Sequence, residues 1–210
     1  MNFKIRNFIL WIGVIGLIIF LFGIEPRSQS PLSQGNFTSK LDSGNGEVWQ
    51  EAFVADGFDF PVGAPDTEGY YNAQKFGENK HLGDDWNATS GGNSDLGHPI
   101  YSTANGQVSQ SYNAGGAWGN IVRIIHRNPN GKKIESLYAH CEERFVKKGD
   151  WVKRGEKIAS IGNANGAYFA HLHFEIRDIC DLELGPGYSS NTNGYLSPTE
   201  FILSNRPKKN

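Results

Sequence analysis

The segment from His171 to Arg177 alternates polar and apolar residues without a break, in the order His-Leu-His-Phe-Glu-Ile-Arg. A period of two residues is typical of a β-strand that is buried on one face only. The apolar face can pack on a core, which leaves His171 and His173 side by side on the polar face. Their Cα atoms are expected roughly 6–7 Å apart, close enough for both imidazoles to serve one small site. Two histidines on an exposed strand are also common without any function, so the rest of the chain has to decide between the two interpretations.

The composition and the turn signals of the chain favour an all-β domain. Of its 210 residues 26 are glycines, and short runs of β-branched and aromatic residues alternate with turn signals such as Asn128-Pro-Asn-Gly131. Abundant glycine suits the tight turns between many short strands. We therefore predict a mainly antiparallel β-sheet or sandwich. A short C-terminal helix is expected through about Ser204, because Ser197, Pro198 and Glu200 form a capping-box pattern.

Charge and cysteine content argue against two classes of protein. The formal net charge of -2 gives no electrostatic basis for binding nucleic acid. The two cysteines, Cys141 and Cys180, are too few for a disulfide scaffold, and we do not expect them to pair.

The N-terminus is predicted to anchor the chain in a membrane. Lys4 and Arg6 precede an uncharged apolar run of about 17 residues, from Phe8 to Ile24, which is near the lower limit for spanning a bilayer. Basic residues before the run place the N-terminus in the cytoplasm and the rest of the chain outside it. A cleaved signal peptide followed by secretion is the alternative, but the run is not followed by a small-residue cleavage site.

Three regions are therefore expected along the chain. A transmembrane signal-anchor covers residues 1–25, a flexible linker covers residues 26–50, and a folded domain covers residues 51–205. The linker is polar and contains Gly, Ser and Pro, with little to bury. We expect the folded domain to lie on the extracytoplasmic side of the cell membrane, held by a single membrane-spanning helix.

A second group of metal-binding residue types lies at His81-Leu-Gly-Asp-Asp85. Imidazole and carboxylate together are a common combination of zinc ligands. On an ideal strand the Cα atoms of His81 and Asp85 would lie about 13 Å apart, so we expect the segment to bend, and Gly83 allows the bend. Asp84 is an alternative ligand, although adjacent side chains usually diverge. A catalytic zinc needs three protein ligands and an open position, and one histidine of the pair described above would complete such a set.

The other histidine of the pair and His140 would then be free for proton transfer or for stabilising an oxyanion. His140 ends a predicted strand over residues 134–140, with Tyr138 expected on the same face. Glu175 and Arg177 share the polar face with the histidine pair, and we expect them to form an exposed ion pair. His126 ends another predicted strand and is expected in a structural hydrogen bond.

Together these motifs resemble the lysostaphin-type zinc endopeptidases of bacterial cell walls. The resemblance covers roughly residues 58–202 and rests on four motifs in the family's order: H-x-G-x-D at 81–85, Tyr138-Ala-His140, the glycine-turn segment 149–158, and His171-Leu-His-Phe-Glu175. It implies a mainly antiparallel β-fold with an open active-site groove and cleavage of peptides in peptidoglycan. It also implies the zinc ligands His81, Asp85 and His173 and the catalytic histidines His140 and His171.

The chain departs from the family pattern at one place. Residues 167–170, Ala-Tyr-Phe-Ala, stand where the family often has a Gly-Pro-type approach to the histidine pair, so the sequence leaves the substrate preference open. The main alternative function is a non-catalytic binding module that activates other cell-wall hydrolases. Such relatives usually lack ligands, and none is missing here. A phosphotransfer domain would leave His81 and Asp85 unexplained. We expect a monomeric zinc metalloendopeptidase whose partners are peptidoglycan peptides and, through the anchor, the membrane.

Overall fold

The computed structural model describes residues 39–41 and 48–208. The predicted signal-anchor over residues 1–25 and most of the predicted linker lie outside the described residues. Among the residues that the structure does describe, no helix is long and apolar enough to cross a membrane.

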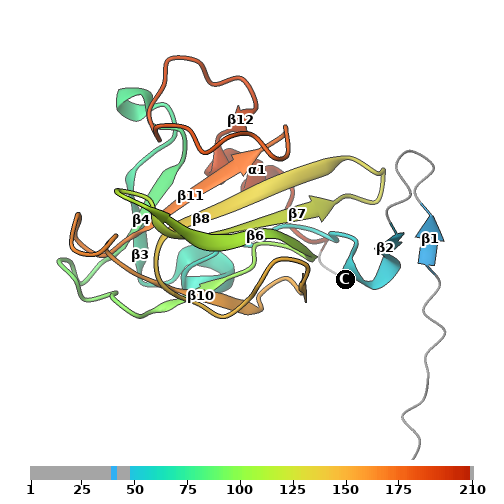
Figure 1. Cartoon of the computed structure of the whole chain (residues 1–210), viewed down its shortest axis with the longest axis horizontal. Coiled ribbons are helices and arrows are strands. Elements are labelled where there is room, and N and C mark those ends of the chain that lie inside the picture. Colours follow the sequence, from blue (N-terminus) through green and yellow to red (C-terminus); the bar gives the residue numbers. More distant parts are fainter. Residues whose placement is uncertain (1–38, 42–47, 209–210) are drawn as a thin grey trace, which may run out of the picture. The chain divides into compact units, whose positions relative to one another are not determined.

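An antiparallel β-sheet of ten strands dominates the described part of the chain (Figure 1). Its main path runs in the order β3-β4-β11-β8-β7-β6-β9, while β10 pairs with β5 and β8, and β12 pairs with β11. The strands β1 and β2 form a separate two-stranded sheet. The strands are β1 (Ser39–Leu41), β2 (Val48–Gln50), β3 (Tyr70–Gln74), β4 (Asp84–Ala88), β5 (Pro99–Tyr101), β6 (Gly106–Gly115), β7 (Gly119–Arg127), β8 (Lys133–Arg144), β9 (Trp151–Val152), β10 (Lys157–Ile161), β11 (Leu172–Arg177) and β12 (Tyr195–Leu196).

Helical structure in the described residues is short. The one α-helix is α1 (Pro198–Ser204), and short helical turns are η1 (Glu51–Phe53), η2 (Gly63–Thr67) and η3 (Glu78–Lys80). These elements confirm the predicted mainly antiparallel β-fold with a short C-terminal helix.

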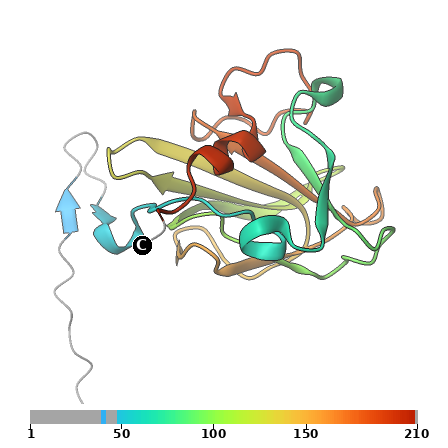
Figure 2. The same ribbon diagram turned by 180° about the vertical axis from the view of Figure 1, so that it is seen from behind.

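One face of the large sheet carries the main hydrophobic core. Leu172, Phe174 and Ile176 of β11 all point into it, as the alternation predicts. Helix α1 packs on this face through Ile202 (Figure 2). Burying each side chain of this size contributes roughly 1.5–3 kcal/mol. A smaller apolar cluster lies on the opposite face, and its members are Ile121, Leu137 and Ala139.

The polar face of β11 is buried as well, which the alternation does not predict. Glu175 and Arg177 are only 1% and 0% exposed, so the prediction of an exposed ion pair is wrong. The physical reason is that the chain folds back after β11. Arg177 Nη1 donates to the carbonyl of Leu182 at 3.2 Å, and the guanidinium lies over the ring of Tyr195 in β12. The pair is thus covered by a segment that follows it in the sequence.

Helix α1 begins at the predicted residue but is capped by a different side chain. Ser197 makes no side-chain capping bond. Instead, Asp84 Oδ2 of β4 accepts hydrogen bonds from the backbone N–H and the hydroxyl of Thr199, at 3.0 and 2.6 Å. Its other carboxylate oxygen accepts a bond from the N–H of Phe76. The capping-box prediction is therefore wrong, because a carboxylate from a distant strand takes the place of the local serine.

Candidate active site

A cleft of about 240 Å³ brings together all the site residues selected from the sequence. His81 follows η3, Asp85 lies in β4, and His140 lies in β8. His173 lies in β11, and His171 immediately precedes that strand. The remaining walls come from residues far apart in the sequence: Gln74, Ala117, Trp118, Tyr168, Pro186, Gly187 and Tyr188.

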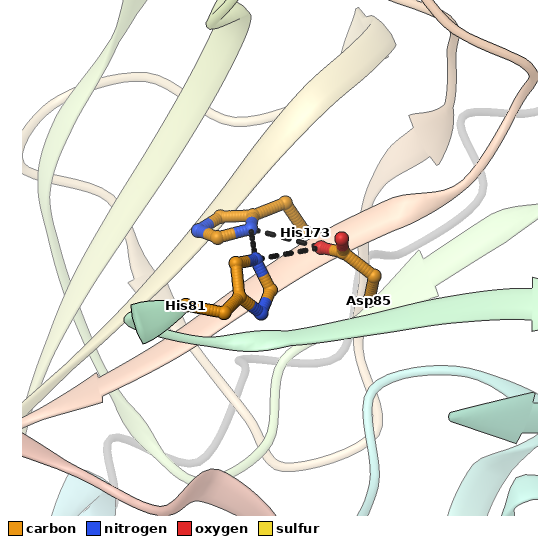
Figure 3. A group of neighbouring side chains, drawn as sticks. All are labelled: His81, Asp85 and His173. Carbon is orange, nitrogen blue, oxygen red and sulfur yellow. Dashed lines mark hydrogen bonds and ion pairs between the residues drawn. The ribbon is translucent and has the colours of Figure 1, made fainter. Parts of the chain in front are cut away.

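Three side chains point toward one common centre in this cleft (Figure 3). His81 Nε2 lies 3.0 Å from His173 Nδ1 and 3.3 Å from Asp85 Oδ1. His173 Nδ1 lies 2.9 Å from the same Asp85 oxygen. The backbone explains part of this convergence, because His173 and Asp85 are direct partners in the antiparallel pair β11–β4.

The predicted bend between His81 and Asp85 is confirmed by their contact. Gly83 lies between them, and its backbone runs against β11. A Cβ atom on Gly83 would come within 2.5 Å of the Phe174 carbonyl oxygen and 3.0 Å of His173 Cε1. Only glycine leaves room for this approach, which places His81 beside the strand that carries His173. Asp84 points away to cap α1, so it is not part of the cluster.

The three donor atoms fit a zinc ion in both spacing and chemistry. Ligand atoms bound tetrahedrally at 2.0–2.1 Å from zinc lie about 3.3–3.4 Å from one another, close to the spacing found here. Two imidazole nitrogens and one carboxylate oxygen form a common zinc ligand set that leaves a fourth position open. Among the described residues, His81 Nδ1 is buried without a hydrogen-bond partner. These residues could therefore hold a zinc ion.

The protonation of the cluster shows how strongly it favours positive charge. Burial opposes the charged form of Asp85, but hydrogen bonds from His173 and His81 outweigh it and hold the pKa of Asp85 well below its usual value. Burial likewise opposes the charged form of His173. Hydrogen bonds to Asp85 and Glu175 reverse that effect and raise the pKa of His173 to about 9. A centre that takes up a proton in this way is a centre where a cation is electrostatically favoured.

His140 enters the cleft because β8 is irregular at this residue. In a regular strand Tyr138 and His140 would share a face, as predicted. The structure contradicts this: Tyr138 packs in the main core against Phe174, whereas His140 faces the cleft. His140 has a φ of 61°, a left-handed conformation that costs a non-glycine residue on the order of 1–3 kcal/mol. The pairing of β8 with β7 shifts register between Asn120 and Val122, beside this residue.

His140 and His171 lie next to the three-residue cluster, and a backbone carbonyl contacts Nδ1 of each ring. Their ring centroids are 4.8 Å apart, and the His140 ring lies 5.6 Å from that of His173. His171 Nδ1 lies 2.8 Å from the carbonyl of Phe169, and His140 Nδ1 lies 3.3 Å from the carbonyl of Trp118. A carbonyl accepts hydrogen bonds only, so in each neutral ring Nδ1 carries the proton and Nε2 has the free lone pair. Burial and then the charges of His173 and His171 lower the pKa of His140 to about 3.

Three aromatic side chains line the cleft, and the sequence predicts them only in part. Tyr168 lies in the 167–170 segment already noted for its departure from the family pattern, and it contacts His140 and His171. Trp118 stacks on His140 with the ring centroids 6.2 Å apart, and its indole N–H donates a hydrogen bond to the Gly185 carbonyl. The Tyr188 ring lies 5.1 Å from that of His81. The sequence carries no local signal for Tyr188, because its place depends on how the chain folds back after β11.

His126 has the structural role predicted for it. It is fully buried outside the cleft, with Nδ1 at 3.0 Å from the Asn105 carbonyl and Nε2 at 2.7 Å from Ser136 Oγ. Burial lowers the pKa of His126 to about 4, and the bond to Asn105 only partly offsets this.

A protein-family model matches the part of the chain that contains the whole cluster. The model of Peptidase family M23 matches residues 79–185, a range that includes all five site residues. The lipoprotein NlpD of Yersinia enterocolitica is 41% identical over 81 residues, which are 39% of this chain and 78% of that protein.

Two other curated relatives are longer proteins. The peptidoglycan DD-endopeptidase ShyB of Vibrio cholerae is 38% identical over 104 residues, 46% of this chain and 23% of ShyB. The murein hydrolase activator NlpD of Escherichia coli is 36% identical over 96 residues, 43% of this chain and 24% of that protein. The chain thus matches about a quarter of each of these two relatives.

A solved structure supports the fold. The chain aligns with a structure of the SpoIIQ–SpoIIIAH pore-forming complex at a TM-score of 0.53 and 19% identity, over 72% of this chain and 92% of that one. Similarity at this identity concerns the fold alone.

Proposed function

Because the chain belongs to peptidase family M23, as its motifs predict, we propose that it is a zinc metalloendopeptidase that hydrolyses peptide bonds in peptidoglycan. The observation that carries this proposal is the convergence of His81, Asp85 and His173 on one centre beside two further histidines. In the proposal the first three residues are the zinc ligands. His140 and His171 are the catalytic residues.

Zinc bound at such a site activates water as a nucleophile near neutral pH and polarises a carbonyl group. The residues of this chain supply the proton transfers. His140 and His171 each present the lone pair of Nε2, because their Nδ1–H groups donate hydrogen bonds to backbone carbonyls. Either ring can accept the proton of the attacking water, and the resulting imidazolium can then stabilise the oxyanion and protonate the leaving amine.

The cleft walls would position an extended peptide beside this centre. Trp118, Tyr168 and Tyr188 offer flat apolar surfaces, and none of the residues lining the cleft is a lysine, an arginine or a glutamate. We propose that peptide is recognised chiefly by shape and by these rings.

A non-catalytic activator of cell-wall hydrolases is the second candidate, because two of the relatives are named NlpD and one of them a murein hydrolase activator. An activator has no need of two histidines next to a complete ligand set. We also retain the proposal that residues 1–25 anchor the chain in the membrane and that the domain of residues 51–205 acts outside the cytoplasm as a monomer.

Two measurements separate the candidates. The purified chain should contain zinc and should release new peptide ends from peptidoglycan, identified by mass spectrometry, in a reaction that chelators abolish. His173→Ala should lose both zinc and activity, whereas His171→Ala should keep zinc and lose activity. Zinc-free protein that releases no fragments yet stimulates a separate hydrolase would establish the activator instead.

A further inference from the structure

We propose that Glu175 is a positioning residue that fixes the tautomer of His173, and that Arg177 holds Glu175 in place for this task. The inference rests on the proposed metal-binding role of His173. It concerns a pair of residues that the sequence alone suggested were an exposed ion pair.

The first step is the contact behind His173. Glu175 Oε1 lies 3.0 Å from His173 Nε2, the ring nitrogen that faces away from Asp85. Both side chains are buried, at 1% and 4% exposure. Residues 173 and 175 meet because they lie two apart on the same face of β11. An ionised carboxylate only accepts hydrogen bonds, so Glu175 holds a proton on Nε2 of His173. A metal at the centre would replace the proton that Nδ1 donates to Asp85, and the ring would then bind through Nδ1 and keep its proton on Nε2.

The second step is the restraint on Glu175. Its other oxygen, Oε2, accepts a hydrogen bond from Arg177 Nε at 2.7 Å and lies 2.6 Å from Arg177 Nη2. Arg177 is itself fixed by the Leu182 carbonyl and by the Tyr195 ring. Both oxygens of Glu175 are thus in contact with side-chain nitrogens that can donate hydrogen bonds.

These contacts make the effect of Glu175→Gln specific. A glutamine has one oxygen and one NH₂ group in place of two oxygens. Arg177 offers only donors, so it selects the glutamine oxygen and turns the NH₂ group toward His173 Nε2. That nitrogen must then accept, and the ring proton moves to Nδ1, the atom that should bind metal. The substitution therefore reverses the tautomer with almost no change in volume.

The chain contains a matched control one strand away. Glu135 in β8 is fully buried and bonded to Arg123 at 2.5 Å. Arg123 also donates to the Leu182 carbonyl, as Arg177 does. Glu135 thus has a similar setting, but no bond joins it to His173. Glu135→Gln tests what loss of a buried carboxylate charge does to the fold by itself.

The experiment measures zinc affinity of the full chain by competition with a chromogenic chelator, for the unsubstituted protein, Glu175→Gln and Glu135→Gln. We expect a 10–100-fold loss of zinc affinity for Glu175→Gln, the usual effect of removing such an outer partner, and less than a threefold change for Glu135→Gln. Equal affinity of Glu175→Gln and the unsubstituted chain would overturn the proposal. So would an equal loss in both variants, since the effect would then be structural.

A second measurement needs no variant and keeps the proposal testable if Glu175→Gln fails to fold. In ¹⁵N NMR of the zinc-loaded chain, the His173 ring proton should be bonded to Nε2 and the zinc to Nδ1. Zinc on Nε2 with the proton on Nδ1 would refute the role of Glu175. Zinc binding with this tautomer but without peptidoglycan hydrolysis would refute the proposed peptidase and support the positioning role, whereas absence of zinc binding would overturn both.

Discussion

Replacing Gly83 with alanine should damage the proposed metal site far more than its small volume suggests. The new Cβ atom would lie 2.5 Å from the Phe174 carbonyl oxygen, and carbon atoms of this kind do not approach closer than 3.0 Å. The segment must therefore move away from β11 by at least the difference, 0.5 Å. Metal–ligand distances tolerate a deviation of about 0.2 Å. We therefore expect His81 to leave the ligand set, with a loss of zinc affinity of more than about tenfold, and overpacking to cost roughly 1–3 kcal/mol of folding free energy.

Gly106→Ala is the matched control for this prediction. A Cβ atom on Gly106 would also come within 2.5 Å of a backbone carbonyl oxygen, that of Ile125, but at the β6–β7 pair outside the cleft. Zinc affinity measured by chelator competition and unfolding in urea measured without metal separate the two effects. We expect both variants to lose stability and only Gly83→Ala to lose zinc affinity. Normal zinc binding by Gly83→Ala, or an equal loss in Gly106→Ala, would refute the reasoning.

Three further predictions concern the cap of α1, a buried histidine and the cleft wall. Asp84→Ala should destabilise the fold by about 2 kcal/mol or more in urea unfolding, because Thr199 loses its hydrogen-bond acceptor. The zinc content of this variant should stay normal, whereas a substitution of a proposed zinc ligand should lower it. Because the folded chain holds the pKa of His126 near 4, the unfolded chain, with a pKa near 6.5, binds the extra proton first as the pH falls. The contribution of His126 to stability should therefore be constant above about pH 6.5 and be lost, by about 3 kcal/mol, between pH 6.5 and 4, so the fall in stability over this range should be smaller by that amount in His126→Gln. Trp118→Phe keeps an aromatic ring but loses the hydrogen bond to the Gly185 carbonyl. The KM for a peptide substrate should therefore rise several-fold, which corresponds to about 1 kcal/mol of binding free energy, while zinc affinity is unchanged.

The sequence predicts those parts of the site that depend on local spacing. The alternation in β11 correctly predicts which side chains enter the core, and the glycine between His81 and Asp85 correctly predicts the bend. Both follow from steric rules that act within a few residues.

Other parts depend on contacts between distant segments, which a single sequence does not reveal. His140 faces the cleft because its own backbone is left-handed and lies beside a register shift in the β7–β8 pair. A regular strand pattern would place its side chain on the other face of the sheet. The cap of α1 comes from Asp84, more than a hundred residues before the helix. In the same way, the segment that follows β11 covers Arg177, the partner of Glu175, through Leu182 and Tyr195.

The gradient of burial along one face of β11 explains how neighbouring residues of one strand pattern can have different proposed roles. Side-chain exposure falls from 12% at His171 to 4% at His173, 1% at Glu175 and 0% at Arg177. A group that exchanges protons with water and substrate must be reached by both, which suits His171. A metal ligand must be fixed in direction, which suits His173, because a carboxylate lies on each side of its ring. An ion pair that fixes this direction is strongest away from water, which suits Glu175 and Arg177. The alternation of the strand places all four on one face, and their depth in the fold separates the proposed catalytic group from the ligand and the ligand from its support.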